Sequence, residues 1–408
     1  MSRRWVVLAL IFTGILISYV DRGNLGLAAT SIMRDFSFPP GTMGVLLSAF
    51  FWTYAAFQIP AGAIVDRVGI RRVYAMAFLL WSVASALIGF ARGMTDILAL
   101  RMLLGLAEAA GPIASLSYIR KNFSGAEIGL PTSIYIAGQN MGPALGALIG
   151  TQLIANHGWR FMFIATGVGA LAWLPFWWWL APRDDGRAPS VAGAAPKPPI
   201  PWGEITSNGA FWAISVCVLF SSYFWYFLLT WVPAYLTISR GFTTVEMGKV
   251  ISTPLFIMAG FNIVAGFAAD KLINRVGSVF RVRLWFCVAG FLGSGSMLLL
   301  LVLPGKEVVL PILLVAICSA GIGNSNYWAI AQHTPPVTLV GRTIGYLNTL
   351  SQLAGAAAPL VTGWILGPEK QFGIAVLVAG VCTILAGLTL LFTGANGLDR
   401  MKANLEHS

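Results

Sequence analysis

Twelve segments of this chain are each long and apolar enough to cross a membrane as a helix, and they take up most of its 408 residues. A membrane-spanning helix needs about 20 apolar residues. The segments are residues 5–28, 43–64, 73–91, 97–119, 130–154, 161–180, 211–236, 247–269, 282–303, 308–333, 341–365 and 372–393. Their connections are short, so the sequence predicts an all-α membrane protein with twelve transmembrane helices and no extramembrane domain of useful size.

The composition supports this class. Only 10% of the residues are charged and 57% are hydrophobic, whereas about 25% of the residues of a soluble domain are charged. These values argue against a water-soluble enzyme, a disordered chain and a nucleic-acid binder. The net charge of +11 therefore needs an explanation other than a nucleic-acid partner.

The basic residues are distributed unevenly between the loops. If both termini lie on one side of the membrane, the loops on that side carry 17 Lys and Arg residues and the opposite loops carry seven. Basic residues collect in cytoplasmic loops, so we expect both termini in the cytoplasm. Short loops and tails fit a multi-pass protein of a bacterial inner membrane.

A polar stretch divides the chain into two halves. Residues 181–208 are rich in Pro, Ala and charge, which favours an extended cytoplasmic linker. Six predicted helices precede it in residues 1–180 and six follow in residues 209–396, with a cytoplasmic tail at 397–408. Two parallel six-helix halves are typical of carriers that bind their substrate between the halves at mid-membrane.

Similar loops follow the second and the eighth predicted helix. Gly62-x-x-x-Asp66-Arg67-x-Gly69-x-Arg71-Arg72 is echoed 204 residues later by a Gly-x-x-x-Asp-Lys sequence. This loop is the signature of the major facilitator superfamily, which the chain resembles over its whole length. Acids and bases at helix ends can latch one conformation, and a simple topogenic basic loop is the alternative. The expected latch residues are Asp66, Arg67, Arg71, Arg72, Asp270 and Lys271.

Four ionisable residues lie deep inside predicted helices: Asp21, Arg22, Arg101 and Glu108. Charges within a span are costly and mark candidate functional sites. Asp21 and Arg22 are about 100° apart on their helix and point in different directions, whereas Arg101 and Glu108 share a face about 10 Å apart along the axis without direct contact. The alternative is a self-neutralising structural network, because the four formal charges sum to zero.

Hydroxyl, amide and aromatic side chains occur at similar depth in both halves, and together they would suit a small polyhydroxylated ligand. They are Tyr19, Tyr54, Gln58, Gln139, Asn140, Ser325, Asn326, Tyr327, Trp328, Gln332, Asn348 and Gln352. Each is weakly diagnostic alone, because amides also bridge packed helices.

Three motifs narrow the resemblance: Tyr19-Val-Asp21-Arg22, Arg101-Met-Leu-Leu-Gly-Leu-Ala-Glu108, and a Trp-Val-Pro-Ala-Tyr-Leu run at 231–236. They resemble the anion:cation symporter branch, which includes bacterial sugar-acid carriers and the vesicular glutamate and sialic acid carriers. The resemblance implies that Arg22 binds the substrate carboxylate, and that Asp21 and Glu108 take protons.

The resemblance also implies roles for the neighbouring residues. Arg101 would couple both to Glu108 and to Tyr54. The amides of Gln139 and Asn348 would hold substrate hydroxyls, and Ser325 and Trp328 match the residues with which the tenth helix lines the site. The expected substrate-binding residues are Arg22, Tyr19, Tyr54, Gln139, Ser325, Trp328 and Asn348.

The expected function is proton-coupled symport of a small organic anion, such as a sugar acid, by alternating access. We expect a monomer in the lipid bilayer with no cofactor and no metal, although carboxylates could also serve sodium. No enzyme is expected, because the three histidines and the remaining residues form no nucleophile–base pair or metal cluster.

A glycine stripe at Gly138, Gly142, Gly146 and Gly150 resembles the glycine pattern of proton-coupled drug exporters of the same superfamily. This resemblance favours one alternative, a proton-coupled drug or organic-ion exporter of the same fold. The other interpretation of the stripe is close approach of two helices. An organophosphate antiporter is a weaker alternative, because the C-terminal spans offer no base to a divalent anion.

Overall fold

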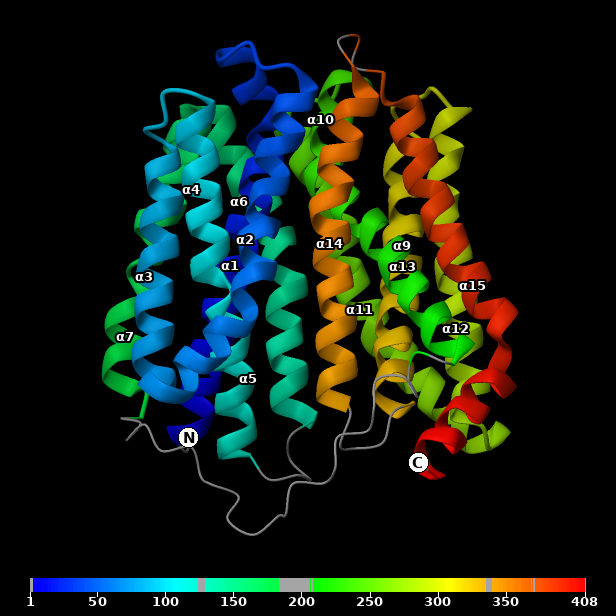
Figure 1. Cartoon of the computed structure of the whole chain (residues 1–408). Coiled ribbons are helices and arrows are strands. Elements are labelled where there is room, and N and C mark those ends of the chain that lie inside the picture. Colours follow the sequence, from blue (N-terminus) through cyan, green and yellow to red (C-terminus); the bar gives the residue numbers. More distant parts are fainter. Residues whose placement is uncertain are drawn as a thin grey trace. The chain divides into compact units, whose positions relative to one another are not determined.

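The computed structural model describes residues 3–123, 129–182, 206, 208–334, 340–367, 369 and 371–407, and the regular structure within them is entirely helical (Figure 1). Eleven helical stretches of these residues are long and apolar enough to cross a membrane. The sequence predicts twelve membrane-spanning segments, and the two counts differ because of one stretch. Leu130–Leu180 is one stretch of 51 residues, and it contains the non-helical Gly158, which lies between the two predicted segments.

The helices follow one another with short connections. In chain order they are α1 (Arg3–Asp35), α2 (Pro40–Val68), α3 (Ile70–Ile88), α4 (Met94–Glu108), α5 (Ala110–Asn122), α6 (Gly129–Ala170), α7 (Trp173–Leu180), α9 (Gly209–Thr230), α10 (Val232–Ile238), α11 (Thr244–Val276), α12 (Val279–Ser294), the 3₁₀ helix η1 (Gly295–Leu301), α13 (Val309–His333), α14 (Val340–Leu366) and α15 (Phe372–His407).

Two compact units divide the chain. The first contains Met1–Gly193, Leu229–Ser252 and Pro359–Lys370, and the second contains Ala194–Leu228, Thr253–Ala358 and Gln371–Ser408. The first unit therefore holds α1 to α7, and the second holds most of the later helices. The predicted linker 181–208 lies almost wholly outside the described residues.

In the first unit, α6 packs closely against α1 through its glycine stripe. A Cβ atom built on Gly138 would lie 2.5 Å from Ile15 Cγ2, and one on Gly142 would lie 2.7 Å from the Leu16 carbonyl oxygen. Contacts this short leave no room for a larger side chain. The interpretation of the stripe as a surface for close helix packing is confirmed.

Aromatic side chains join α7 to the first unit. Trp173 stacks on Phe78 of α3 at 4.2 Å between ring centroids, and Trp177 meets Tyr74 edge-on at 4.8 Å. The indole of Trp173 also donates a hydrogen bond to the Leu10 carbonyl of α1 at 2.9 Å. These contacts hold α7 against α1 and α3.

The second unit has its own core, formed by α9, α12, α13, α14 and α15. It includes Phe211, Cys217, Phe291, Tyr327 and Leu390, each less than a tenth exposed. All four cysteines of the chain are buried free thiols in this unit, where they pack as small hydrophobes.

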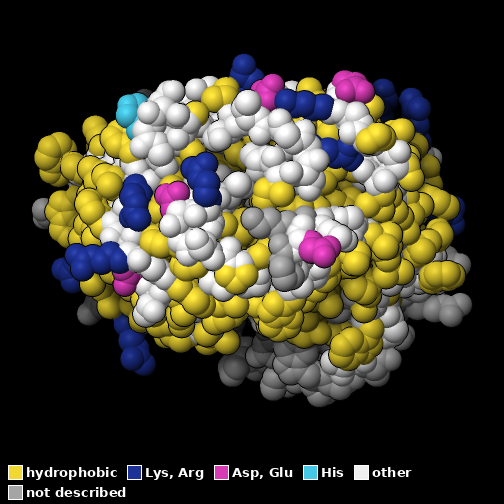
Figure 2. All heavy atoms as spheres, turned by 90° about the horizontal axis from the view of Figure 1, so that it is seen from above, with side chains coloured by type: hydrophobic (Ala, Val, Ile, Leu, Met, Phe, Trp, Pro, Cys, Tyr) yellow, Lys and Arg dark blue, Asp and Glu magenta, His cyan; other side chains and the backbone are white. Residues whose placement is uncertain are grey.

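Large hydrophobic side chains are exposed along the helices of both units, among them Ile59, Phe267 and Phe392. Such an extended apolar surface is unsuited to water and fits contact with lipid. Figure 2 looks onto one end of the helices and shows Lys, Arg, Asp and Glu side chains on that end, with broad hydrophobic areas around it.

Candidate functional site

The four charged residues predicted within spans all belong to the first unit, where α1 carries Asp21 and Arg22, and α4 carries Arg101 and Glu108. Asp21, Arg101 and Glu108 are at most 2% exposed. Ionised groups buried this deeply require partners. Their hydrogen bonds therefore define what the cluster can do.

Arg22 and Glu108 form a buried ion pair. Arg22 Nε lies 2.7 Å from Glu108 Oε2, and the two side chains are 7% and 0% exposed. Ser18 Oγ donates to the same carboxylate oxygen at 2.8 Å. Ser18 and Arg22 are four residues apart, so both reach Glu108 from one face of α1.

Three aromatic rings surround the Arg22 guanidinium. Its central carbon lies 4.4 Å from the Tyr19 ring centroid, 4.6 Å from that of Tyr54 and 5.1 Å from that of Phe50. Aromatic faces stabilise a desolvated cation. One of its two terminal nitrogens, Nη2, is buried without a hydrogen-bond acceptor among the described residues. The cation therefore has N–H donors available for an anion.

Asp21 faces away from this pair, as the angular separation on α1 predicts. Its Oδ1 atom accepts hydrogen bonds from Ser85 Oγ at 2.9 Å and from Asn24 Nδ2 at 3.3 Å. Asn24 also donates to Thr166 Oγ1 at 3.1 Å. No Lys or Arg nitrogen of the described residues lies within ion-pair distance of Asp21, so neutral donors from α1 and α3 hold this carboxylate.

Arg101 does not contact Glu108. Its guanidinium lies 5.2 Å from the Phe50 ring centroid, and its Nε and Nη1 atoms have no hydrogen-bond acceptor in the described part of the chain. The seven-residue spacing on α4 predicted this separation. Glu108 forms its ion pair with Arg22 instead, and the coupling of Arg101 to Glu108 and Tyr54 that the family resemblance implies stays a prediction.

Gln139 of α6 lies beside the aromatic groups of the first unit. Its amide nitrogen donates to the hydroxyl of Tyr19 at 3.0 Å and to that of Tyr135 at 3.1 Å. Tyr19 therefore links the surroundings of Arg22 to the amide that sequence analysis predicted to bind substrate hydroxyls.

The other predicted substrate-binding residues belong to the second unit. Ser325 is exposed and donates to the Ile322 carbonyl within α13 at 3.1 Å. The Trp328 ring lies 5.0 Å from the Tyr327 ring, and Asn348 is half-buried on α14. The polar groups expected from the C-terminal half are thus borne by α13 and α14.

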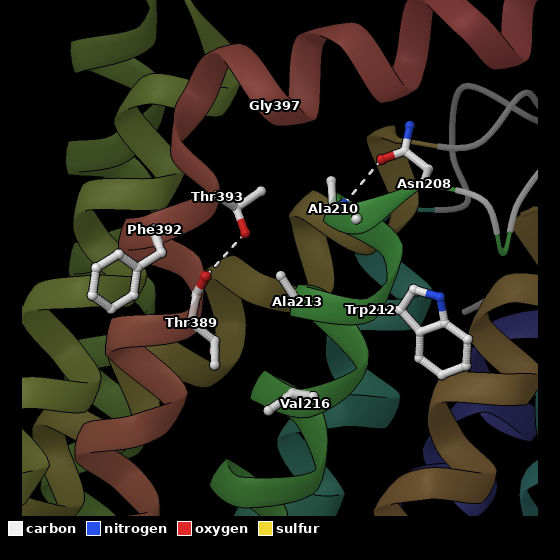
Figure 3. A pocket seen from close by; sticks show the side chains of 10 residues that line it. Asn208, Ala210, Trp212, Ala213, Val216, Thr389, Phe392, Thr393 and Gly397 are labelled. Atoms are coloured by element: carbon white, nitrogen blue, oxygen red, sulfur yellow. Dashed lines mark hydrogen bonds between the residues drawn. The ribbon is translucent and has the colours of Figure 1, made fainter.

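A separate surface pocket of about 720 Å³ lies between α9 and α15 (Figure 3). Apolar, threonine and asparagine side chains line it, including Trp212, Phe392 and Thr389, and none of the lining residues that the structure describes is charged. It contains none of the predicted site residues. Without a cation, it lacks the group that would recognise a carboxylate.

The predicted latch residues have different surroundings. Asp66, Arg67 and Arg72 are exposed, whereas Arg71 donates to the Trp178 carbonyl and stacks on its ring at 4.5 Å. In the second unit Asp270 is exposed and accepts an ion-pair contact from Arg283 Nη2 at 3.1 Å.

Arg283 was not predicted from the sequence. Its Nη1 atom donates to Asn326 Oδ1 at 3.3 Å, so it connects Asp270 of α11 to Asn326 of α13. Lys271, the remaining predicted latch residue, is exposed.

Sequence reasoning also missed the neutral groups around the acids: Ser18, Ser85 and Thr166. A signal existed for Ser18, because a residue four positions before Arg22 shares its helical face. Ser85 is 64 residues from Asp21 and Thr166 is 142 residues from Asn24 along the chain. Single hydroxyls in apolar helices carry no distinguishing pattern.

These features define a class of protein: a multi-pass, all-helical membrane protein with a buried cluster of charges inside its spans. The chain belongs to the Major Facilitator Superfamily, whose family model matches residues 11–359. It is accordingly a membrane transporter and not an enzyme.

Relatives transport a range of anions, according to their names. A probable galactarate/D-glucarate transporter of Escherichia coli is 29% identical over 425 residues, covering 96% of this chain and 93% of that protein. A D-galactonate transporter of Escherichia coli is 28% identical over 417 residues, covering 96% of each. A chloroplastic ascorbate transporter of Arabidopsis thaliana is 28% identical, covering 97% of this chain and 76% of that protein.

Solved structures of other transporters share the fold. A bacterial homolog of the human lysosomal transporter Spinster has a TM-score of 0.76 and 16% identity, covering 100% of this chain and 98% of that one. A D-xylose–proton symporter has a TM-score of 0.76 and 15% identity, covering 97% and 99%. At these identities the likeness shows the fold alone.

Proposed function

We propose that the chain is a proton-coupled symporter of a small organic anion, such as a sugar acid or a related carboxylate, working by alternating access. The observation that carries the proposal is the buried Arg22–Glu108 ion pair inside an aromatic enclosure. The relatives named as galactarate/D-glucarate and D-galactonate transporters support the substrate class.

The first step is competition for Arg22. A guanidinium recognises a carboxylate through two parallel N–H donors, and Arg22 Nη2 has no acceptor among the described residues while Nε is bonded to Glu108. A substrate carboxylate that binds side-on, to Nε and Nη2, displaces Glu108, and we propose this mode over end-on binding to Nη1 and Nη2. Substrate binding therefore releases the Glu108 carboxylate from its cation.

The second step is protonation of the released acid. With both acids ionised, the four charges of the cluster sum to zero, and a monocarboxylate would add one negative charge to a buried region. Carrying that charge through low-dielectric surroundings is costly. One proton on Glu108 restores neutrality and leaves Ser18 to satisfy the acid by a neutral hydrogen bond.

This competition couples the two ligands in both directions. A proton on Glu108 removes the competitor for Arg22, so it strengthens substrate binding, and by linkage bound substrate strengthens proton binding. Neutrality requires at least one proton for each monoanion. We assign a second proton site to Asp21, while Arg101 supplies the permanent positive charge that balances the cluster. Sodium on the acids is the rival coupling ion.

Polar residues of both units would recognise the substrate hydroxyls. We assign this role to Tyr19, Tyr54 and Gln139 in the first unit, and to Ser325, Trp328 and Asn348 in the second. Amide and hydroxyl groups reject analogues that lack a matching hydroxyl, because their own hydrogen bonds are then left unmade.

The remaining assignments concern placement. We place the protein in the cell membrane as a monomer, with both termini in the cytoplasm, because basic residues concentrate in the loops on that side. The loop residues Asp66, Arg67, Arg71, Arg72, Asp270 and Lys271 would act there as a conformational latch.

Uptake by proteoliposomes tests the proposal. Purified protein should concentrate radiolabelled D-galactonate or D-glucarate when the external side is made acidic, and a proton ionophore should abolish the accumulation. Arg22→Ala should remove binding of both acids. Accumulation driven by a sodium gradient alone would contradict proton coupling, and transport of lipophilic cations instead of carboxylates would favour the exporter alternative.

A further inference from the structure

A second basic site lies in the first unit, where the N-terminal ends of α1 and α3 meet the C-terminal end of α7. The structure has a pocket of about 760 Å³ here, lined by Arg3, Arg71, Trp178, Trp179, Ala181 and Pro182. This volume lies within the range of about 300–1,000 Å³ typical of ligand pockets. None of these residues belongs to the Arg22–Glu108 cluster.

The two arginines are fixed by the end of α7. Arg3 Nε donates to the Leu180 carbonyl at 3.2 Å, and Arg71 donates to the Trp178 carbonyl. Arg71 is held further by stacking on the Trp178 ring, while its own carbonyl accepts from Trp177 Nε1 at 3.0 Å. The guanidinium groups are therefore positioned by the backbone.

The charge of the pocket is positive. Among the described residues that line it, two carry a guanidinium group and none is acidic. The C-terminal end of a helix carries only about half a negative charge, so α7 cannot neutralise both arginines. A guanidinium has five N–H donors, and the Arg3–Leu180 bond uses one of those on Arg3. The pocket is thus suited to an anion with several oxygen acceptors.

The apolar side chains next to the pocket identify the level of the membrane at which it lies. Trp179 is 74% exposed, and Trp178 and Phe176 are each about half exposed on the outer face of α7. In a membrane-spanning chain, tryptophans gather at the boundary between headgroups and acyl chains. An anion beside these rings would have its polar part at the arginines and its apolar part along α7.

We propose that this pocket binds the phosphate headgroup of an anionic phospholipid. Arginine binds phosphate oxygens through its planar fork of donors, and basic pockets at the membrane surface attract anionic headgroups. The acyl chains would lie against the exposed face of Phe176 and Trp179. The alternative is that the arginines only cap the end of α7, in which case headgroup chemistry is irrelevant to them.

Another candidate occupant is the acidic pair Asp184–Asp185, which follows Pro182 closely in the sequence and lies outside the described residues. If this pair filled the pocket, replacing both acids by asparagine would strengthen lipid binding. We expect that variant to bind lipid as the original chain does.

Native mass spectrometry of the purified full chain tests the proposal by competing phosphatidylglycerol against phosphatidylcholine of the same acyl composition. We expect selective retention of phosphatidylglycerol. Each of Arg3→Gln and Arg71→Gln should weaken it about fivefold, the effect expected of one basic residue near an anionic membrane surface. Arg120→Gln, which removes an exposed charge at the end of α5, is the matched control and should leave the selectivity unchanged.

Several outcomes would overturn the proposal: equal retention of the two lipids by the original chain, unchanged selectivity in both pocket variants, or an equal loss in Arg120→Gln. Displacement of the lipid by millimolar inorganic phosphate would show that the pocket takes free phosphate. Stronger binding in the Asp184→Asn/Asp185→Asn variant would assign it to the acidic pair. Arg71→Lys keeps the charge without the fork, and should retain part of the selectivity if either glutamine variant does not fold.

Discussion

Replacing Glu108 by glutamine should tighten substrate binding while it abolishes proton-driven accumulation. Glutamine keeps the shape of the side chain and an oxygen that can accept from Arg22 and Ser18, but it carries no charge and takes no proton. The carboxylate that competes with substrate for Arg22 is thereby removed. The variant represents the protonated state of Glu108 at every pH.

The expected size of the effect follows from the bond that substrate must break. Arg22 Nε and Glu108 Oε2 are 2.7 Å apart in a side-chain pair that is at most 7% exposed. A charge-assisted hydrogen bond contributes about 1.5–3 kcal/mol and a neutral one about 0.5–1.5 kcal/mol. The difference of about 1–1.5 kcal/mol corresponds to roughly 5- to 12-fold tighter binding of a sugar acid.

Calorimetric titration with D-galactonate or D-glucarate at an acidic and at a mildly alkaline pH provides the measurement. The affinity of the original chain for the sugar acid should rise as the pH falls, because protonation of Glu108 removes the competing carboxylate. The pH dependence that Glu108 contributes should disappear in the variant. In proteoliposomes the variant should still exchange labelled for unlabelled substrate, but it should not concentrate substrate on a proton gradient.

Asp21→Asn serves as the matched control. Asp21 is also a buried acid, but it accepts from Ser85 and Asn24 and forms no ion pair with the described residues. Its neutralisation removes one negative charge from the cluster but leaves Arg22 bound to Glu108, so it should tighten substrate binding less than Glu108→Gln does. Weaker binding in Glu108→Gln, an unchanged pH dependence, or equal tightening in Asp21→Asn would refute the competition for Arg22.

Three further substitutions test the packing and the charges. Arg22→Met should destabilise the protein by about 3–5 kcal/mol, because it leaves Glu108 as an unpaired buried charge. The double variant Arg22→Met/Glu108→Met should recover much of that stability but not carboxylate binding. Chemical unfolding measures the first effect and ligand titration the second. Gly142→Ala should lower the free energy of unfolding by about 1–3 kcal/mol through overpacking, since a Cβ there would lie 2.5 Å from a side-chain carbon of α1. Gly169 has open space around it, so Gly169→Ala is the control and should unfold at the temperature of the original chain. Arg283→Gln should change stability by about 1 kcal/mol, because its partner Asp270 is 68% exposed and water screens the pair. A change in the rate of substrate exchange in this variant would indicate a role for Arg283 in conformational switching.

The helical architecture could be predicted from the sequence because the bilayer imposes it. A lipid-exposed chain must satisfy its backbone hydrogen bonds within each helix, so apolar segments of sufficient length locate the spans. The predicted gap between residues 154 and 161 contains the non-helical Gly158, which interrupts the stretch Leu130–Leu180. The break between α4 and α5 falls at Ala109, three residues before Pro112 in the sequence. Because Pro112 has no N–H, the Glu108 carbonyl lacks its helical donor at this point.

The charged residues of the candidate site were also predictable, because an ionisable residue inside a span stands out against apolar neighbours. Their partners were not. Arg22 and Glu108 are 86 residues apart, and nothing in the spacing favours this pair over Arg101 and Glu108. The choice depends on how α1 and α4 pack, and α1 is positioned in turn by the glycines of α6.

The different partners of the two acids explain how one cluster could serve both substrate and protons. Glu108 is bonded to the cation that a substrate carboxylate would take, so its proton occupancy changes with substrate binding. Asp21 is held by the neutral donors Ser85 and Asn24, and no competition with substrate acts on it directly. Only an acid whose counter-ion is also the substrate anchor links the two binding equilibria locally. A self-neutralising structural network has no need of that arrangement, because apolar packing would stabilise the helices at lower cost.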